Sequence, residues 1–303
     1  MKSDLDTWDL PEEHALIEQM RDTVLSRIND CSAKNMRFYW RTVYLVGNGA
    51  VTGGDIPLRH WLAEGGIGRR SPFYKDLDWG TKLGHMSMLS RLARTMTEGD
   101  KSTSSDSRSF CDNVAVSRDD LAKRYKNAVE TKSITARRLP DVLERGLYSG
   151  DSLVICLNWD TTFFDDSRIP NIIQLHGSTS QPSTMIFPCE FALDFFGRNR
   201  KDGFPYDIPN ETVKLIGYAH RISMESIERC TNVVVWGLNV NAYDAEVIAV
   251  LNASSGRNNI KKLDVVNPSK EAGKRAAAIL GCESFNLHRP GKDGSWEVDH
   301  VRP

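Results

Sequence analysis

Hydrogen-bonding side chains that could take part in chemistry stand directly after two apolar runs of this chain. Asn158 and Asp160 follow the run from Ser152 to Leu157, and His176 follows the run from Ile172 to Leu175. Runs of this composition predict buried strands. An imidazole with an ordinary pKa near about 6.5 can exchange a proton close to neutral pH. Structural alternatives stay open, since a histidine can cap a strand and an Asn or Asp can form an Asx turn.

A glycine-rich stretch follows an earlier apolar run, Val43 to Val46. It begins with Gly47-Asn48-Gly49 and continues to Gly53-Gly54, which gives the spacing G-x-G-x-x-x-G. Glycines after a strand allow backbone N–H groups to approach a phosphate, because no side chain holds the anion away. The spacing is one residue longer than the usual dinucleotide fingerprint, so a glycine-rich turn without a ligand is the alternative.

Two further predicted strands end in the same way. Gly237-Leu238-Asn239 follows Asn232 to Trp236, and Asn267-Pro268 follows Leu263 to Val266. Ligands of parallel α/β sheets gather outside the carboxyl ends of the strands. The strand ends of this chain therefore predict one ligand site along one edge of a sheet, although Asn and Gly are also common in ordinary turns.

Helices are predicted between these strands, and the alternation indicates a parallel sheet with helices on both faces. Residues 98–109 and 187–209 are predicted as loops. The predicted helices are Pro11 to Asn29, Leu83 to Met96, Ser117 to Glu130 (with Ser117 as an N-cap), Pro140 to Gly150, Glu211 to Cys230, Ala245 to Leu251 and Lys270 to Leu280.

Composition narrows the class of protein. The chain has 303 residues, enough for one large α/β domain or two small ones, and a net charge of −1, so no direct nucleic-acid binding is expected. No apolar run is long enough to span a bilayer, and the acidic, polar N-terminus is unlike a signal peptide. The six cysteines include no C-x-x-C pair. A cytoplasmic protein without disulfides or structural zinc is therefore expected.

The ordered set of strand-end motifs resembles the SIR2 (sirtuin) superfamily. The chain differs from that family at Asn48, Val51, Asp55 and His60, where Ala, Ser, Gly and Arg are usual. The matching residues are Gly47, Gly49, Ile56 and Pro57 of the glycine-rich loop, Asn158 and Asp160 of an N-x-D motif, the pair His176-Gly177, and Asn267-Pro268.

Protein-deacylating sirtuins carry a zinc ribbon with two C-x-x-C pairs, which this chain lacks. The chain is therefore more similar to the SIR2-like proteins of bacterial anti-phage defence, which hydrolyse NAD+. The resemblance implies one SIR2-like Rossmann domain over residues 1–303. Residues 1–40 would form an N-terminal helical segment, residues from about 60 to 150 a helical insertion or lid, and residues 151–303 the remainder of the sheet.

The resemblance also implies an activity and a site. The activity would be an NAD+ glycohydrolase, with NAD+ as substrate and no metal, regulated as an effector of abortive infection by oligomerisation or by a partner protein that senses infection. An NAD+- or ADP-ribose-binding module without catalysis is the alternative, and an NAD-dependent protein deacylase is a third. The implied catalytic residues are Asn158, Asp160 and His176, and the implied cofactor-binding residues are Gly47, Asn48, Gly49, Thr52, Ile56, Pro57, Gly237, Leu238, Asn239 and Asn267.

Overall fold

A computed structural model describes residues 40–64, 82, 84, 86, 89, 105–185, 187, 211–240, 245–252, 259–291 and 293–303. The helix predicted from Pro11 to Asn29 lies outside this part of the chain, as does the loop predicted over 187–209 apart from Phe187. Of the helix predicted around Leu83 to Met96, the described positions 84, 86 and 89 are helical.

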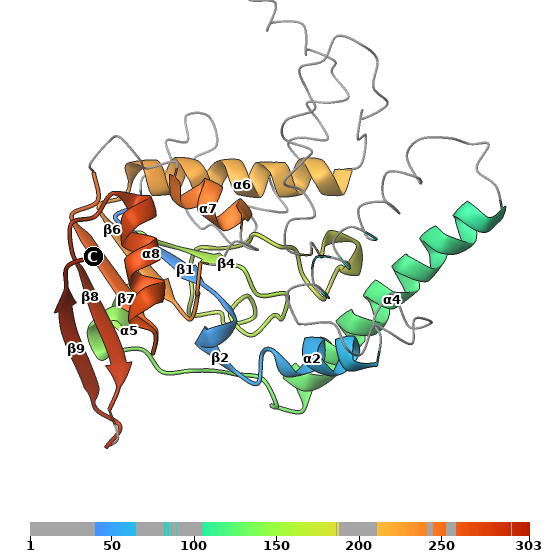
Figure 1. The fold of residues 1–303 in the computed structure, drawn as a ribbon, viewed down its shortest axis with the longest axis horizontal. Helices are drawn as coiled ribbons and strands as arrows, with labels where there is room; N and C mark the ends of the chain where they lie inside the picture. The colour runs from blue at the N-terminus through green and yellow to red at the C-terminus, as the bar shows by residue number, and fades with distance from the viewer. Residues whose placement is uncertain are drawn as a thin grey trace, which may run out of the picture.

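The centre of the structure is a seven-stranded, mostly parallel sheet (Figure 1). The strands lie in the order β5-β4-β1-β6-β7-β8-β9, and β9 is the one antiparallel member. The first six form the 3-2-1-4-5-6 arrangement of a doubly wound, Rossmann-like α/β fold. The bounds of all seven strands are β1 Thr42–Val46, β4 Ser152–Cys156, β5 Ile172–Gln174, β6 Asn232–Trp236, β7 Lys262–Val266, β8 Phe285–Pro290 and β9 Trp296–Val301.

Both faces of the sheet carry apolar side chains, as expected for parallel strands buried between helices. On β1, Val43 and Leu45 belong to one apolar cluster, which includes side chains of α6 (Glu211–Arg229), α7 (Ala245–Asn252) and α8 (Lys270–Leu280). Tyr44 and Val46 belong to the other, with side chains of α2 (Ile56–Ala63), α4 (Ser105–Glu130) and α5 (Asp141–Leu147). The predicted α/β fold with helices on both faces is confirmed.

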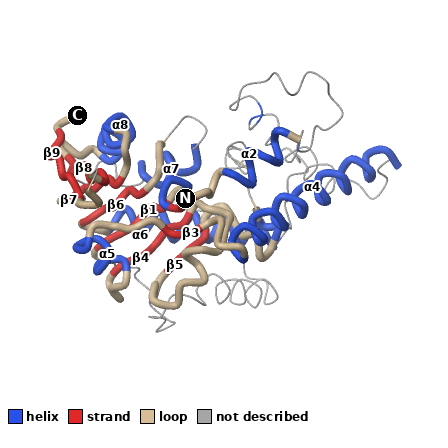
Figure 2. The backbone as a smooth tube through the Cα atoms, turned by 90° about the horizontal axis from the view of Figure 1, so that it is seen from below, coloured by secondary structure: helices blue, strands red, loops and turns tan. Residues whose placement is uncertain are grey.

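Helix α4 starts earlier than predicted. Ser117 is not an N-cap but lies inside this 26-residue helix, and residues 105–109 are helical rather than part of a loop. The reason is a buried stripe at helical spacing, Val114, Arg118, Leu121 and Tyr125, which continues the packed face through Ser117. Figures 1 and 2 show that α4 extends outward from the sheet.

A two-stranded ribbon that was not predicted lies beside the glycine-rich stretch. Strand β2 (Val51–Thr52) pairs antiparallel with β3 (Thr135–Ala136), which precedes α5. The strands β8 and β9 were also not predicted.

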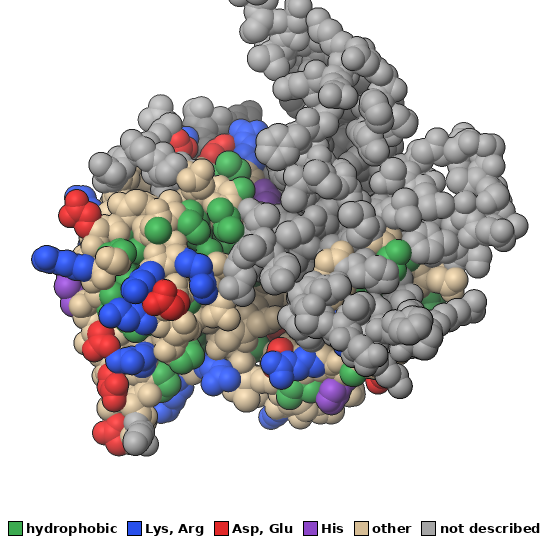
Figure 3. Space-filling view, in the orientation of Figure 1, with side chains coloured by type: hydrophobic (Ala, Val, Ile, Leu, Met, Phe, Trp, Pro, Cys, Tyr) green, Lys and Arg blue, Asp and Glu red, His purple; other side chains and the backbone are tan. Residues whose placement is uncertain are grey.

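On the face of the molecule drawn in Figure 3, acidic and basic side chains are interspersed over α8 and the β8–β9 ribbon. No helix in the described part of the chain is long and apolar enough to cross a membrane.

Candidate functional site

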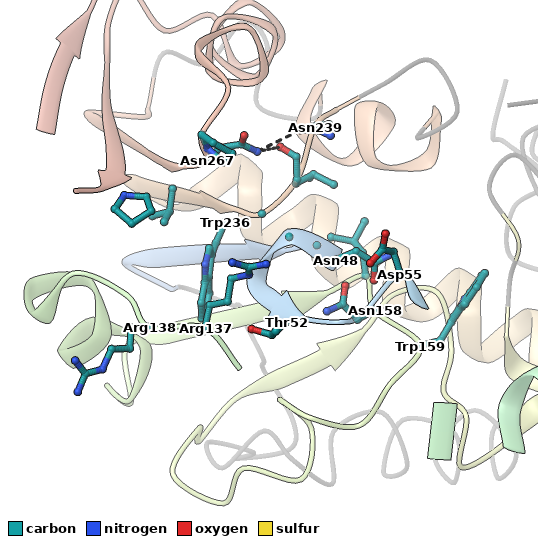
Figure 4. A pocket seen from close by; sticks show the side chains of 18 of the residues that line it. Asn48, Thr52, Asp55, Arg137, Arg138, Asn158, Trp159, Trp236, Asn239 and Asn267 are labelled. Carbon is teal, nitrogen blue, oxygen red and sulfur yellow. Dashed lines mark hydrogen bonds between the residues drawn. The ribbon is translucent and has the colours of Figure 1, made fainter. Parts of the chain in front are cut away.

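A pocket of about 970 Å³ opens at the carboxyl ends of the strands (Figure 4). It lies where the strand order reverses, because the chain runs from β1 outward to β4 and β5 and then returns to β6 on the other side of β1. Doubly wound sheets bind their ligands at this switch point, and cofactor pockets have volumes of about 300–1,000 Å³. The pocket therefore has the position and the size of a ligand site.

The structure brings most of the predicted site residues to this pocket. The β1 loop, the β4 end, the β5 end and the loops after β6 and β7 all contribute to its lining. The predicted residues found there are Gly47, Asn48, Gly49, Thr52, Asn158, His176, Gly237, Leu238, Asn239 and Asn267.

Three predicted residues lie outside the lining. Ile56 and Pro57 form the first turn of α2, where Ile56 is 46% exposed and Pro57 is buried. Asp160 is fully buried, and its Oδ1 accepts a hydrogen bond of 3.0 Å from the Thr162 backbone N–H. This local bond is the Asx turn considered as the alternative for this motif. Burial raises the pKa of the Asp160 carboxyl, while the bonds to Thr162 oppose that shift.

The glycines after β1 and β6 allow two loops to touch. The Gly47 N–H donates to the Trp236 carbonyl oxygen at 2.9 Å, and the Gly49 N–H donates to the Gly237 carbonyl oxygen at 2.8 Å. Gly237 has φ of 64°, and a Cβ atom there would lie 2.1 Å from the Ala50 nitrogen. These two N–H groups are thus engaged within the protein, and contact of the glycine-rich loop with a pyrophosphate stays a prediction.

Asn158 and His176 place buried polar atoms at the β4 and β5 ends of the pocket. Asn158 is 2% exposed, and within the described residues neither its Oδ1 nor its Nδ2 has a hydrogen-bond partner. The same holds for Nε2 of His176, which is 7% exposed. Leaving such atoms unpaired costs about 1–3 kcal/mol each, so a ligand that pairs with them would recover that energy.

The His176 imidazole is neutral at ordinary pH. Burial, and to a lesser extent the nearby His220, lower its pKa to about 3, while a hydrogen bond with the Leu157 backbone opposes the shift. Gly177 turns the chain sharply after this histidine, with φ of 75°. A Cβ atom at Gly177 would overlap the backbone of Thr184, so the tight turn that positions His176 requires glycine.

Asn267 serves to hold two loops together. Its Nδ2 donates to the Leu238 carbonyl oxygen at 3.1 Å and to Oδ1 of Asn239 at 3.3 Å (Figure 4). Its Oδ1 accepts a bond of 2.8 Å from the Ser269 backbone N–H, where α8 begins. The Asn267 amide is therefore occupied by protein partners, although the residue lines the pocket as predicted.

The pocket also contains residues that sequence reasoning did not assign to it. Trp159 stands inside the N-x-D motif and Trp236 ends β6, so their positions at strand ends could have indicated them. Arg137 and Arg138 follow β3 and reach the pocket through the pairing of β2 with β3, for which the sequence gives no local indication.

Among the described residues, no group of three or more His, Cys, Asp or Glu side chains is arranged to hold a metal ion. Comparison of the chain with protein-family models, curated proteins and solved structures found no match.

Proposed function

We propose that the protein is an NAD+ glycohydrolase, which converts NAD+ and water into nicotinamide, ADP-ribose and a proton. The observation that carries the proposal is the pair Asn158 and His176, whose buried polar atoms lie at a pocket on the switch point of a Rossmann-like sheet. The ordered strand-end motifs, which resemble those of SIR2-like NADases, support the same activity.

The bond to be broken joins the ribose C1′ to a positively charged pyridinium nitrogen, which leaves with the bonding electron pair as neutral nicotinamide. The leaving group therefore needs no proton from the protein, and the chain has to orient the ribose and a water molecule. The Asn158 amide can donate to and accept from such hydroxyl groups at the same time.

His176 would act as a neutral hydrogen-bonding partner of the attacking water or of a ribose hydroxyl. A group with a pKa of about 3 is a weak base at neutral pH, so its contribution lies in orientation more than in early proton removal. The proton of the attacking water passes to solvent as ADP-ribose forms.

The test is loss of NAD+ and release of nicotinamide by the purified protein, measured for wild type and for His176→Ala and Asn158→Ala. We expect a loss of activity of about 100-fold or more in each variant. Arg221→Ala serves as a surface control, because this side chain is 73% exposed on α6. Full turnover by His176→Ala would refute the proposed role of the imidazole.

The pH profile gives a second test of this site. Since burial lowers the pKa of His176 to about 3, the imidazole stays neutral from pH 8 down to well below the ordinary histidine range. We expect no fall of activity centred near about 6.5, the value for an unperturbed histidine. A fall at that pH that disappears in His176→Asn would show that the imidazole titrates normally.

A binding module without catalysis is the second candidate. It is favoured by the position of Asp160, which lies outside the pocket lining and whose Oδ1 accepts a bond from Thr162, while its Oδ2 has no hydrogen-bond partner among the described residues. Calorimetry with NAD+ separates the two functions: tight binding with the dinucleotide recovered intact favours the module. Binding of neither NAD+ nor ADP-ribose would refute both.

The proposed biological role is that of an NAD+-depleting effector in anti-phage defence. This part of the proposal rests on the resemblance to SIR2-like defence proteins. An unregulated activity of this kind would drain the host cell, so control by oligomerisation or by a partner protein belongs to the proposal. Expression of wild type and Asn158→Ala with and without neighbouring genes tests it through cell growth.

A further inference from the structure

The charge of a bound pyrophosphate needs a partner other than the N–H groups of Gly47 and Gly49. The Gly47 and Gly49 N–H groups donate to carbonyl oxygens of the β6 strand and loop. They cannot also bind a ligand in this arrangement, since each N–H group makes one good hydrogen bond. A side chain beside the loop can supply donors in their place.

Arg137 is held against the loop at two points. Its backbone N–H donates to the Ala50 carbonyl oxygen at 2.8 Å, and its side-chain Nε donates to the Val51 carbonyl oxygen at 3.2 Å. Within the described part of the chain, its two terminal nitrogens have no hydrogen-bond partner. Figure 4 shows the Arg137 side chain in the pocket near Trp236, whereas Arg138 points away from the other labelled residues.

Of the other charged side chains that line the pocket, Arg138 points away from the other labelled residues (Figure 4), and the remaining two cancel each other. Arg59 and Asp55 both line the pocket and form an ion pair, with 2.6 Å between Nε of the arginine and Oδ2 of the aspartate. Arg137 is thus the inward-pointing cation whose charge no described acidic side chain balances. A guanidinium presents parallel N–H donors that match two phosphate oxygens.

We propose that Arg137 binds the pyrophosphate of the dinucleotide, in the place that the glycine-loop N–H groups would take in an ordinary Rossmann site. This inference rests on the proposed function, because that function implies a ligand with a pyrophosphate. The contact between Nε and Val51 fixes the guanidinium before the ligand arrives, so little side-chain freedom is lost on binding.

The experiment is calorimetry of ADP-ribose, which carries the pyrophosphate and is not consumed by the proposed reaction. Arg137→Ala should weaken binding about 10- to 100-fold, as expected for loss of charge-assisted bonds. Arg137→Lys keeps the charge without the forked geometry and should lose less. Arg221→Ala is the control, since it removes an arginine that is 73% exposed on α6 and outside the pocket lining, and it should stay within about threefold of wild type. Added salt should weaken wild type more than Arg137→Ala.

The outcomes separate this inference from the activity. ADP-ribose binding that depends on Arg137 supports the inference even if NAD+ is not cleaved. NAD+ cleavage by wild type, together with unchanged ADP-ribose binding by Arg137→Ala, overturns the inference alone. Equal losses in Arg137→Ala and Arg221→Ala also overturn it, because they indicate a diffuse charge effect. A wild type that binds no ADP-ribose overturns it together with the proposed function. If Arg137→Ala does not fold, as judged by thermal melting, Arg137→Lys decides between these outcomes.

Discussion

Replacement of Gly237 by alanine should separate the two loops that form the centre of the pocket. The new Cβ atom would lie 2.1 Å from the Ala50 nitrogen and 2.3 Å from the Gly49 carbonyl carbon, against 3.4–4 Å for an ordinary contact. Both neighbours are backbone atoms, so the loops would have to move apart by about an ångström. Overpacking of this kind costs about 1–3 kcal/mol. The left-handed φ of 64° adds about 1–2 kcal/mol for an alanine.

Gly281→Ala is the control that isolates the contact. Gly281 ends α8 with φ of 68°, and no atom lies within 4 Å of a Cβ placed there. This variant should lose only the conformational part, about 1–2 kcal/mol. We expect Gly237→Ala to lower the free energy of unfolding by about 2–5 kcal/mol, measured by urea denaturation, and to weaken ADP-ribose binding as well. Equal losses of stability in the two variants would refute the argument that the loop contact holds the pocket together.

Two further predictions concern buried polar side chains, Asn267 after β7 and Asp264 within it. Asn267→Ala should lower the free energy of unfolding by about 1–3 kcal/mol through loss of the bonds to Leu238 and Ser269. Asn267→Asp keeps the acceptor for Ser269 but sets a carboxylate oxygen against the Leu238 carbonyl oxygen, so it should lose at least as much in the same urea titration. Burial alone would raise the pKa of Asp264, but hydrogen bonds, including one from His288, hold it below its ordinary value. The carboxylate therefore stabilises the fold above about pH 4, and this contribution is lost as pH falls through the lowered pKa. Urea titrations between pH 3 and 7 should show a shallower acid loss for Asp264→Asn, and an unchanged slope would contradict the assignment.

The central strands could be predicted from the sequence because a run of apolar, β-branched residues within the strand itself indicates it. Runs such as Val43 to Val46 and Asn232 to Trp236 are apolar and largely β-branched, and each forms a strand buried on both faces. Strand β8 lacks such a run because Asn286 and His288 interrupt it. These two side chains bond to Asp264 on the neighbouring strand, a pairing that exists only once the sheet is formed.

In the candidate site, too, some residues could be predicted from the local sequence, whereas the contacts of others exist only in the folded chain. Asn158 and His176 reach the pocket because each closely follows a strand, and these two strands, β4 and β5, are neighbours in the sheet, with β4 beside β1. Asp160 stands only two residues beyond Asn158, yet its carboxylate forms a local turn with Thr162. A short polar side chain can satisfy its own backbone as readily as a ligand, and sequence spacing does not distinguish the two.

The glycine-rich loop shows why a motif alone does not identify the groups that bind a phosphate. Glycine permits close approach of any backbone or ligand, and here the space beside Gly49 is taken by Gly237. The proposed partner of the anion, Arg137, donates its Nε–H to the carbonyl oxygen of Val51, 86 residues away along the chain. Its position follows from the pairing of β2 with β3, and strands of two residues are too short to be predicted from their amino-acid composition. If the pocket takes a pyrophosphate, its affinity is therefore set by a contact between distant segments, and substitutions in the β2–β3 ribbon should alter binding as much as substitutions in the glycines.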